Sequence, residues 1–298
     1  TTRRTPSRTQ RAAVSLLCAL ARPRIRALTA TRSTPTDWAA LVIPSAPLWR
    51  TCVADSATGE IRPLIEERLN TYIESKPLRL AGNGSELIFW SERDGWGHFY
   101  LYDAATGALK NRLTEGEFVT TSLEGIDEKA RVVYLTAAGR ERGEDPYYTH
   151  LYRVGLDGSG MKLLAPGDAS QSAIVSDSNR YFVTNSSRVD TAPESILYDT
   201  LGNLVTKLET PDLTALEEMG FKFPEPFTVK ADDGVTDLYG VMYKPFDFDP
   251  SKKYPIIAYV YPGPQTESVT KTFSPRNASV ALANVAAQSV SVGRVKVV

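Results

Sequence analysis

The chain has 298 residues, of which 42% are hydrophobic and 23% charged, a composition typical of a globular protein with a sizeable core. Glycine and proline are too few for a collagen-like or wholly disordered chain, and the longest apolar stretch, residues 12–21, is too short to span a membrane. Cys18 and Cys52 have no partner at the spacing of a metal site, and no glycine run has the context of a dinucleotide loop. We therefore expect neither a metal nor a cofactor.

The net charge of −1 hides a strongly basic first segment. Residues 1–50 carry nine arginines and one acidic residue, Asp37, and they contain no Lys, Glu, Gly, Tyr or Phe. Such a segment resembles a transit peptide in composition, and residues 12–21 faintly resemble the apolar region of a signal peptide. Both fits are poor, because there is no initiator Met and arginines follow residue 21 where small cleavage-site residues are expected. No aromatic residue lies among the arginines of residues 3–32 to stack on a base, so we expect no nucleic-acid partner. The composition predicts that residues 1–50 are a disordered, Arg-rich leader outside the fold.

A repeat organises the middle of the chain. Each copy has a short apolar run, a polar turn and a second apolar run, and the four first runs begin at residues 53, 101, 151 and 197. A second landmark, a turn followed by a β-rich run, precedes the last three copies at Asn83, Asp127 and Asp177. The runs are rich in Val, Ile, Tyr and Phe and are bounded by Gly, Asn and Asp, which predicts strands and hairpins.

The period of close to 48 residues, with four strands in each period, is typical of β-propeller blades. A single blade cannot bury both faces of its sheet, so neighbouring blades must pack face to face. A β-sandwich is the competing fold, but its strands need not repeat in register. We predict a mainly β fold with a partial propeller of three to four blades over residues 51–210: three full units, and a partial one before them.

The pattern changes after residue 210. Residues 213–220 predict a short helix that ends at a glycine, and residues 227–230 and 238–243 predict a hairpin. Residues 256–261 form a nearly continuous apolar run of the kind that is buried in a parallel sheet, and Pro262-Gly263-Pro264 ends it. A new domain is therefore expected over residues 211–298.

The segment from Phe227 to Gln265 contains Asp233-Gly234, Leu238-Tyr239-Gly240, Lys253-Tyr254-Pro255 and Val260-Tyr261-Pro262-Gly263-Pro264. It resembles the entry to the α/β-hydrolase domain of prolyl oligopeptidase family serine peptidases, and most closely the dipeptidyl peptidase IV subfamily, in which a propeller precedes that domain. The resemblance covers roughly residues 53–284. It implies that residues 51–210 are propeller blades and that residues 211–298 are the N-terminal part of an α/β-hydrolase domain.

The same resemblance implies a serine-type peptidase that acts on short peptides, with the nucleophile on a G-x-S-x-G turn and Asp and His after it. In this family the tyrosine of the Val-Tyr-x-Gly-Pro turn donates to the oxyanion hole, and the matching residue is Tyr261. The resemblance leaves a homodimer of the complete protein open. It favours a periplasmic, extracellular or membrane-anchored location over a cytoplasmic one.

The sequence departs from the family pattern at the catalytic residues. No G-x-S-x-G occurs, and both histidines, His98 and His150, fall in predicted blade strands, where they need no special role. We expect that the chain by itself is inactive, because the nucleophile Ser, the Asp and the His of the family are absent. The alternative function is a non-catalytic propeller module that binds a protein or a peptide.

Two pairs of adjacent glutamates, Glu66-Glu67 and Glu217-Glu218, are candidates for the paired glutamates that bind the substrate amino terminus in the subfamily. Neither pair has the surrounding residues of that motif. We expect both pairs to be solvated charge, without a role in binding substrate.

Overall fold

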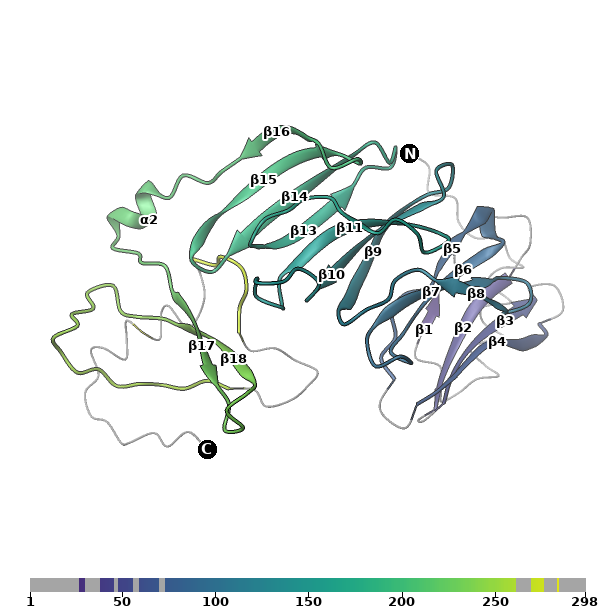
Figure 1. Cartoon of the computed structure of the whole chain (residues 1–298), viewed down its shortest axis with the longest axis horizontal. Helices are drawn as coiled ribbons and strands as arrows, with labels where there is room; N and C mark the ends of the chain where they lie inside the picture. Colours follow the sequence, from purple (N-terminus) through teal and green to yellow (C-terminus); the bar gives the residue numbers. More distant parts are fainter. Residues whose placement is uncertain are drawn as a thin grey trace. The chain divides into compact units, whose positions relative to one another are not determined.

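The computed structural model describes residues 27–29, 38–45, 48–55, 59–69, 73–260, 269–275 and 283. Its strands form four four-stranded sheets, in each of which strands adjacent in sequence are neighbours (Figure 1). The first sheet contains β1 (Ala27–Thr29), β2 (Trp38–Ser45), β3 (Leu48–Asp55) and β4 (Ile61–Arg68). The second contains β5 (Arg79–Ala81), β6 (Glu86–Ser91), β7 (His98–Asp103) and β8 (Leu109–Arg112).

The third sheet contains β9 (Val119–Asp127), β10 (Val132–Ala138), β11 (Thr149–Gly155) and β12 (Lys162–Leu163). The fourth contains β13 (Ser170–Val175), β14 (Tyr181–Arg188), β15 (Thr191–Asp199) and β16 (Leu204–Glu209). A 3₁₀ turn (Gly82–Gly84), the helix α2 (Thr214–Glu218) and the hairpin of β17 (Glu225–Lys230) and β18 (Asp237–Met242) complete the described elements.

The sequence repeat coincides with these sheets. Its first landmark falls on the third strand of each sheet, β3, β7, β11 and β15, and its second on β6, β10 and β14. Four-stranded antiparallel sheets repeating at this period are the units of a β-propeller, so the predicted fold class is confirmed.

An aspartate in the turn explains the polar part of the repeat. After β7, the Asp103 Oδ1 accepts hydrogen bonds from the backbone N–H of Thr106 at 2.8 Å and from its hydroxyl at 2.8 Å. After β15, the Asp199 Oδ1 accepts from the backbone N–H groups of Leu201 at 3.0 Å and Asn203 at 2.9 Å. The side chain thus satisfies backbone donors that the turn leaves unpaired, and this is why Asp recurs there.

The first sheet begins earlier than the composition predicts. The expectation that residues 1–50 lie outside the fold is wrong for residues 38–45, because β2 pairs with β3 from Trp38↔Asp55 to Ser45↔Leu48. The prediction rested on the high arginine content of residues 1–50. It did not take into account the apolar run Trp38 to Ile43, whose β-branched residues favour a strand. Residues 1–26 and 30–37 lie outside the described residues.

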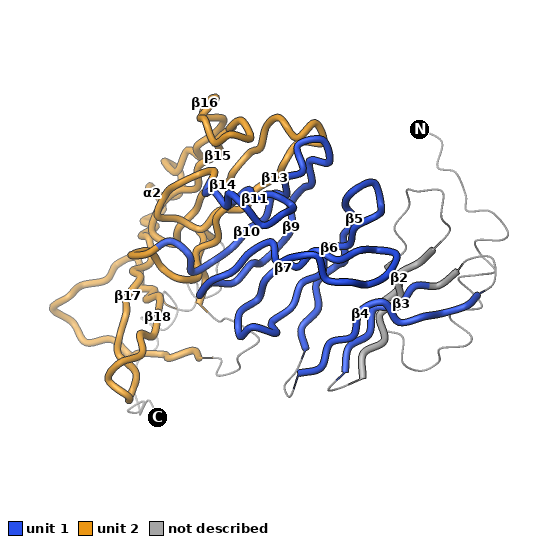
Figure 2. The backbone as a smooth tube through the Cα atoms, turned by 45° about the vertical axis from the view of Figure 1, so that its right-hand side comes forward, with its two compact units in different colours: residues 1–141, 151–163 blue, residues 142–150, 164–298 orange. Residues whose placement is uncertain are grey.

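The chain divides into two compact units, residues 1–141 with 151–163 and residues 142–150 with 164–298 (Figure 2). In the first unit, one core cluster joins the second and third sheets through Trp90, Leu101, Leu135 and Tyr152, all at most 3% exposed. The Trp90 indole N–H donates to the Thr120 carbonyl at 3.0 Å, so the blades are bonded as well as packed.

In the second unit, aromatic side chains supply much of the packing. Phe182 and Tyr198 stack across β14 and β15 with ring centroids 5.2 Å apart. Phe221, which is 8% exposed, contacts the rings of Phe223, Phe246 and Phe273 at 5.4 to 6.0 Å. These contacts gather the chain after the last blade around Phe221.

The predicted elements after residue 210 are found in part. Helix α2 and the hairpin of β17 and β18 lie where they were expected, and Gly220 follows the helix with φ +86°. The strand expected over residues 256–261 is not found over 256–260, whose side chains Ile256, Tyr259 and Val260 are about three-quarters exposed. A strand needs a neighbour for its hydrogen bonds, and among the described residues none pairs with this run.

Within the described residues, no helix has the length and apolar character of a membrane span. Nor does any group of three or more His, Cys, Asp or Glu side chains there have the arrangement of a metal site.

Candidate functional site

Tyr261, the predicted oxyanion donor, lies outside the described residues. The two glutamate pairs are described, and neither forms a twin-carboxylate site. Glu217 and Glu218 are exposed on α2, as predicted. In β4, Glu66 is exposed and paired with Arg50 at 2.5 Å, which also agrees with solvated charge.

The expectation of solvated charge is wrong for Glu67, which is only 5% exposed. Its Oε1 accepts a hydrogen bond from the Ser91 hydroxyl and lies 3.5 Å from the Arg93 Nε. Strand alternation turns Glu67 inward and Glu66 outward, and an adjacent pair in sequence cannot reveal which of its members is buried.

The two histidines lie in blade strands, as predicted. His98, in β7, is 2% exposed, with its Nδ1 3.0 Å from the Thr114 Oγ1 and its Nε2 3.0 Å from the Gly116 carbonyl. Its ring meets that of Phe118 edge to face at 5.0 Å. The side chain is therefore a satisfied core residue of the first unit.

Burial lowers the pKa of His98 below its ordinary value of 6.5, although the bond to Gly116 opposes this shift. The unfolded chain then takes up a proton near pH 6.5, whereas the folded chain does so only at lower pH. We expect the free energy of unfolding to fall as the pH drops from 6.5 through the folded pKa, and His98→Gln to flatten that part of the profile. Denaturant titrations from pH 7.5 to 5.5 measure this. An unchanged slope in the variant would contradict the assignment.

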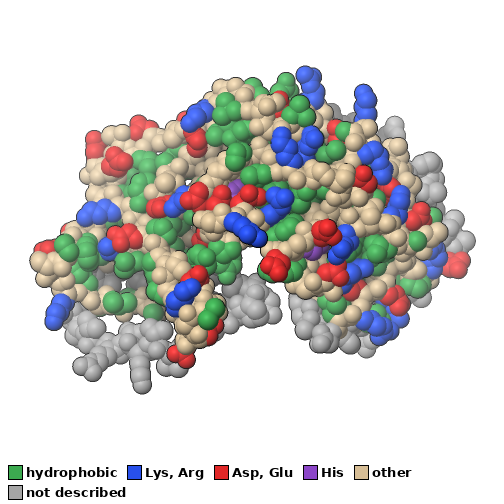
Figure 3. All heavy atoms as spheres, viewed as in Figure 1, with side chains coloured by type: hydrophobic (Ala, Val, Ile, Leu, Met, Phe, Trp, Pro, Cys, Tyr) green, Lys and Arg blue, Asp and Glu red, His purple; other side chains and the backbone are tan. Residues whose placement is uncertain are grey.

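A hollow of about 390 Å³ lies in the second unit. The blade side of its wall consists of Gly143–Asp145, Tyr148, Asp168 and Arg188–Val189, and the other side consists of Pro226–Thr228, Tyr239–Val241 and Thr270–Lys271. Acidic and basic side chains are interspersed over the molecular face shown in Figure 3, in agreement with the net charge of −1. This hollow, which holds charges of both signs, is a candidate binding site in the described part of the chain.

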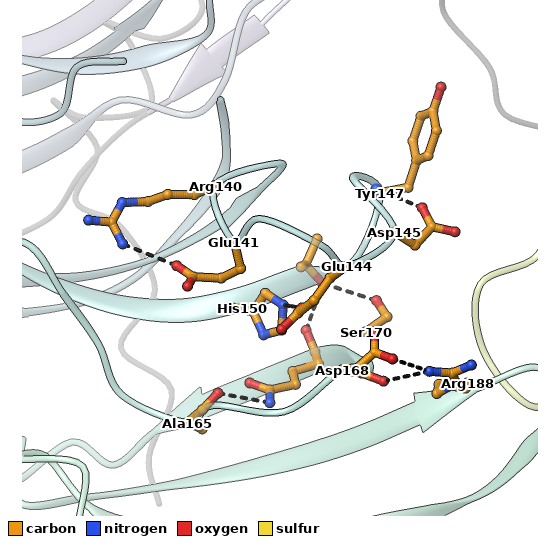
Figure 4. A network of polar contacts seen from close by, with 12 residues as sticks. Arg140, Glu141, Glu144, Asp145, Tyr147, His150, Ala165, Asp168, Ser170 and Arg188 are labelled. Atoms are coloured by element: carbon orange, nitrogen blue, oxygen red, sulfur yellow. Dashed lines mark hydrogen bonds and ion pairs between the residues drawn. The ribbon is translucent and has the colours of Figure 1, made fainter. Parts of the chain in front are cut away.

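Arg188, at the end of β14, is held by two carboxylates. Its Nε and Nη2 donate to the two oxygens of Asp190 at 2.8 and 3.0 Å, and its Nη1 pairs with Asp168 at 2.5 Å. The fork raises the pKa of Arg188 and lowers that of Asp190, because each charge stabilises the other. Arg188 is thus a fixed cation whose donors are engaged within the protein (Figure 4).

Lys271 is enclosed by residues of the loop after β10 and of β18. Its ammonium lies 2.8 Å from the Asp145 carboxylate, 4.6 Å from the ring centre of Tyr147 and 5.1 Å from that of Tyr239. The two rings contact each other edge to face at 5.9 Å. An ion pair between two aromatic faces is stronger than a solvated one, because the rings exclude water and attract the cation.

Local bonds fix the loop that carries Asp145. Its Oδ1 accepts the backbone N–H of Tyr147 at 2.9 Å, and its carbonyl accepts that of Tyr148 at 2.9 Å. From the other side of the hollow, the Phe273 N–H donates to the Ser187 hydroxyl at 2.8 Å. The loop and the segment 269–275 are therefore both anchored.

Tyr148 and Glu144, which is paired with His150, form the remaining polar wall. Tyr148 is 5% exposed, and within the described residues its hydroxyl makes no hydrogen bond. Burial raises its pKa, with Arg188 opposing and the nearby aspartates adding, so the phenol is neutral near pH 7. The Glu144 carboxylate lies 2.8 Å from the His150 Nε2, and the His150 Nδ1 is buried without a partner (Figure 4).

This geometry can bind a ligand, but it does not assemble a nucleophile with a base. Among the described residues no serine or cysteine is held against the imidazole of His150, because its Nδ1 is buried without a partner. The sequence did not predict the hollow, because its walls come from residues more than a hundred positions apart, such as Asp145 and Lys271. The only local signal was the charged run from Arg140 to Asp145 between two predicted strands.

Comparison with known proteins agrees with the fold. Residues 48–193 match the family model described as the dipeptidyl peptidase IV (DPP IV) N-terminal region. Dipeptidyl peptidase 8 of Homo sapiens is 29% identical over 230 residues, covering 63% of this chain and 24% of that protein. Dipeptidyl peptidase 4 of Trichophyton equinum is 28% identical over 202 residues, covering 64% of this chain and 25% of that protein.

The crystal structure of Porphyromonas gingivalis dipeptidyl peptidase 4 superposes with a TM-score of 0.66 at 23% identity, covering 80% of this chain and 34% of that chain. This likeness shows the propeller fold. Residues 48–193 belong to the dipeptidyl peptidase IV family through its N-terminal region, and the chain spans about a quarter of the length of the curated relatives that it matches.

Proposed function

We propose that this chain is part of a serine-type peptidase that acts on short peptides. In that proposal residues 51–210 contribute propeller blades, and residues 211–298 begin the α/β-hydrolase domain. The match of residues 48–193 to the family model carries the proposal. The hairpin of β17 and β18, which precedes the Val260-Tyr261-Pro262-Gly263-Pro264 segment in the chain, supports the second part.

Tyr261 is proposed as the oxyanion donor of this peptidase. A phenol hydroxyl can donate to the oxygen that becomes negative when the peptide carbonyl is attacked. That role needs a nucleophile and a base as partners, and the 298 residues contain no G-x-S-x-G turn to supply the serine.

The 298-residue chain by itself is expected to hydrolyse no peptide. A lone hydrogen-bond donor cannot attack a carbonyl or move a proton to the leaving amine. Purified chain should release no chromophore from Ala-Pro or Gly-Pro p-nitroanilide above the rate in buffer, and a fluorophosphonate probe should leave it unlabelled. Turnover that survives repurification, or a labelled serine, would overturn this prediction.

A second function, a non-catalytic module that binds a peptide, is favoured by the hollow of the second unit. Its walls offer fixed charges, a neutral phenol and aromatic faces, but they hold no serine or cysteine against the imidazole of His150. Direct measurement of binding, without hydrolysis, separates this function from the first.

A further inference from the structure

We propose that the hollow bounded by Glu144, Tyr148, Asp168 and Tyr239 binds the basic side chain of a peptide, an ammonium or guanidinium group on an apolar stem. This inference goes beyond the proposed peptidase function and does not rest on it. It concerns only residues of the second unit, in which every wall of the hollow lies.

The first argument is the charge balance of the walls. Glu144, Asp145 and Asp168 line the hollow. Asp190 does not line it but forms an ion pair with Arg188, which does. Against these four carboxylates stand two permanent cations, Arg188 and Lys271. Two negative charges remain, and His150 can offset at most one of them. The field inside the hollow therefore favours a cation and opposes an anion.

The second argument is the hydroxyl of Tyr148. The side chain is 5% exposed and lines the hollow, yet its oxygen makes no hydrogen bond in the described part of the chain. The oxygen is not one of the buried side-chain atoms that lack a partner, so it is open to the hollow, where it can bond a ligand donor in place of water. The neutral phenol oxygen can accept an N–H from an ammonium or a guanidinium.

The third argument is the lining between the charges. Val189, Phe227 and Val241 offer apolar surface for the stem of a side chain, and the ring of Tyr239 already faces the ammonium of Lys271 at 5.1 Å. A volume of about 390 Å³ is at the lower end of small-ligand pockets, which suits one side chain rather than a folded partner. A bare metal ion is a poor fit, because the carboxylates are spread around the walls and paired with cations.

The test compares charged and neutral probes of the same shape on the whole chain. Acetyl-arginine methylamide and acetyl-lysine methylamide are titrated against acetyl-citrulline methylamide and acetyl-norleucine methylamide, with amide chemical shifts as the readout. The basic probes should bind at least about tenfold more tightly than their neutral counterparts, and the shifts should centre on Tyr148 and Glu144. Equal affinity of arginine and citrulline probes, shifts centred elsewhere, or no saturation by either basic probe would overturn the proposal.

Two variants sharpen the test. Glu144→Gln keeps a hydrogen-bonding group for His150 but removes one charge, and it should weaken the arginine probe by about three- to tenfold. The matched control is Asp232→Asn, an exposed carboxylate of the same unit away from the hollow, which should leave affinity unchanged. Equal effects of the two variants would mean that general charge, not this hollow, attracts the probe. If Glu144→Gln does not fold, the comparison of citrulline and arginine on the unaltered chain still decides the question.

Discussion

Gly107→Ala is expected to destabilise the first unit by about 3 kcal/mol or more, one of the largest effects of a single methyl group in this chain. Gly107 lies in the turn after β7 with φ +75°, a conformation that costs an L-residue about 1–2 kcal/mol. A Cβ at this position would also come closer than 3.0 Å to the backbone oxygen of Leu64 in β4. The Leu64 backbone belongs to the neighbouring blade, and it cannot move away from Gly107 without separating the two blades.

Gly95→Ala is the matched control, because Gly95 has φ +89° but nothing within 4 Å of its Cβ position. It should cost only the conformational penalty, about 1–2 kcal/mol. Urea unfolding followed by tryptophan fluorescence measures both variants. Equal losses for the two substitutions would show that the close approach of the second blade to Leu64 is not present in solution.

Tyr261→Phe is expected to lower kcat by about 10²–10³, or about 2.7–4 kcal/mol, in the polypeptide encoded by the whole reading frame that contains these residues. The reason is the proposed role of the hydroxyl, which would stabilise the oxyanion only in the transition state and so leave KM nearly unchanged. Steady-state kinetics with a dipeptide p-nitroanilide separates the two constants.

The control for Tyr261→Phe is Tyr259→Phe, which removes the hydroxyl of a tyrosine two positions earlier that is 76% exposed. It should leave both constants unchanged. A loss confined to KM in Tyr261→Phe, or equal losses in both variants, would contradict the assignment of the oxyanion donor.

The propeller could be predicted from the sequence because its signals are local and repeated. Each blade places an aspartate at the turn after its third strand, and Asp103 and Asp199 each accept the backbone N–H of the residue two positions later, in two different sheets. The period of the turns then sets the period of the blades. The hairpin of β17 and β18 was predictable for a similar reason, since Asp233 closes its turn with the backbone N–H of Thr236 at 2.8 Å.

The features of the fold and of the candidate site that could not be predicted depend on contacts between residues distant in sequence. The arginine content predicted that the fold begins after residue 50, but the first sheet includes β2, which lies before that boundary. The apolar run at residues 256–260 predicted a strand, but no neighbour forms a ladder with it in the described chain. The candidate hollow is set by pairs such as Asp145 with Lys271, which no local pattern indicates.

The central proposal is that these residues are part of a serine-type peptidase whose nucleophile lies outside them. The most direct measurement labels two proteins side by side with a fluorophosphonate probe, the 298-residue chain and the product of the whole reading frame, and locates the modified residue by mass spectrometry. We expect one labelled serine in the longer product, outside these 298 residues, and none in the shorter chain. A label on a serine within the 298 residues, or no label in either protein, would contradict the claim.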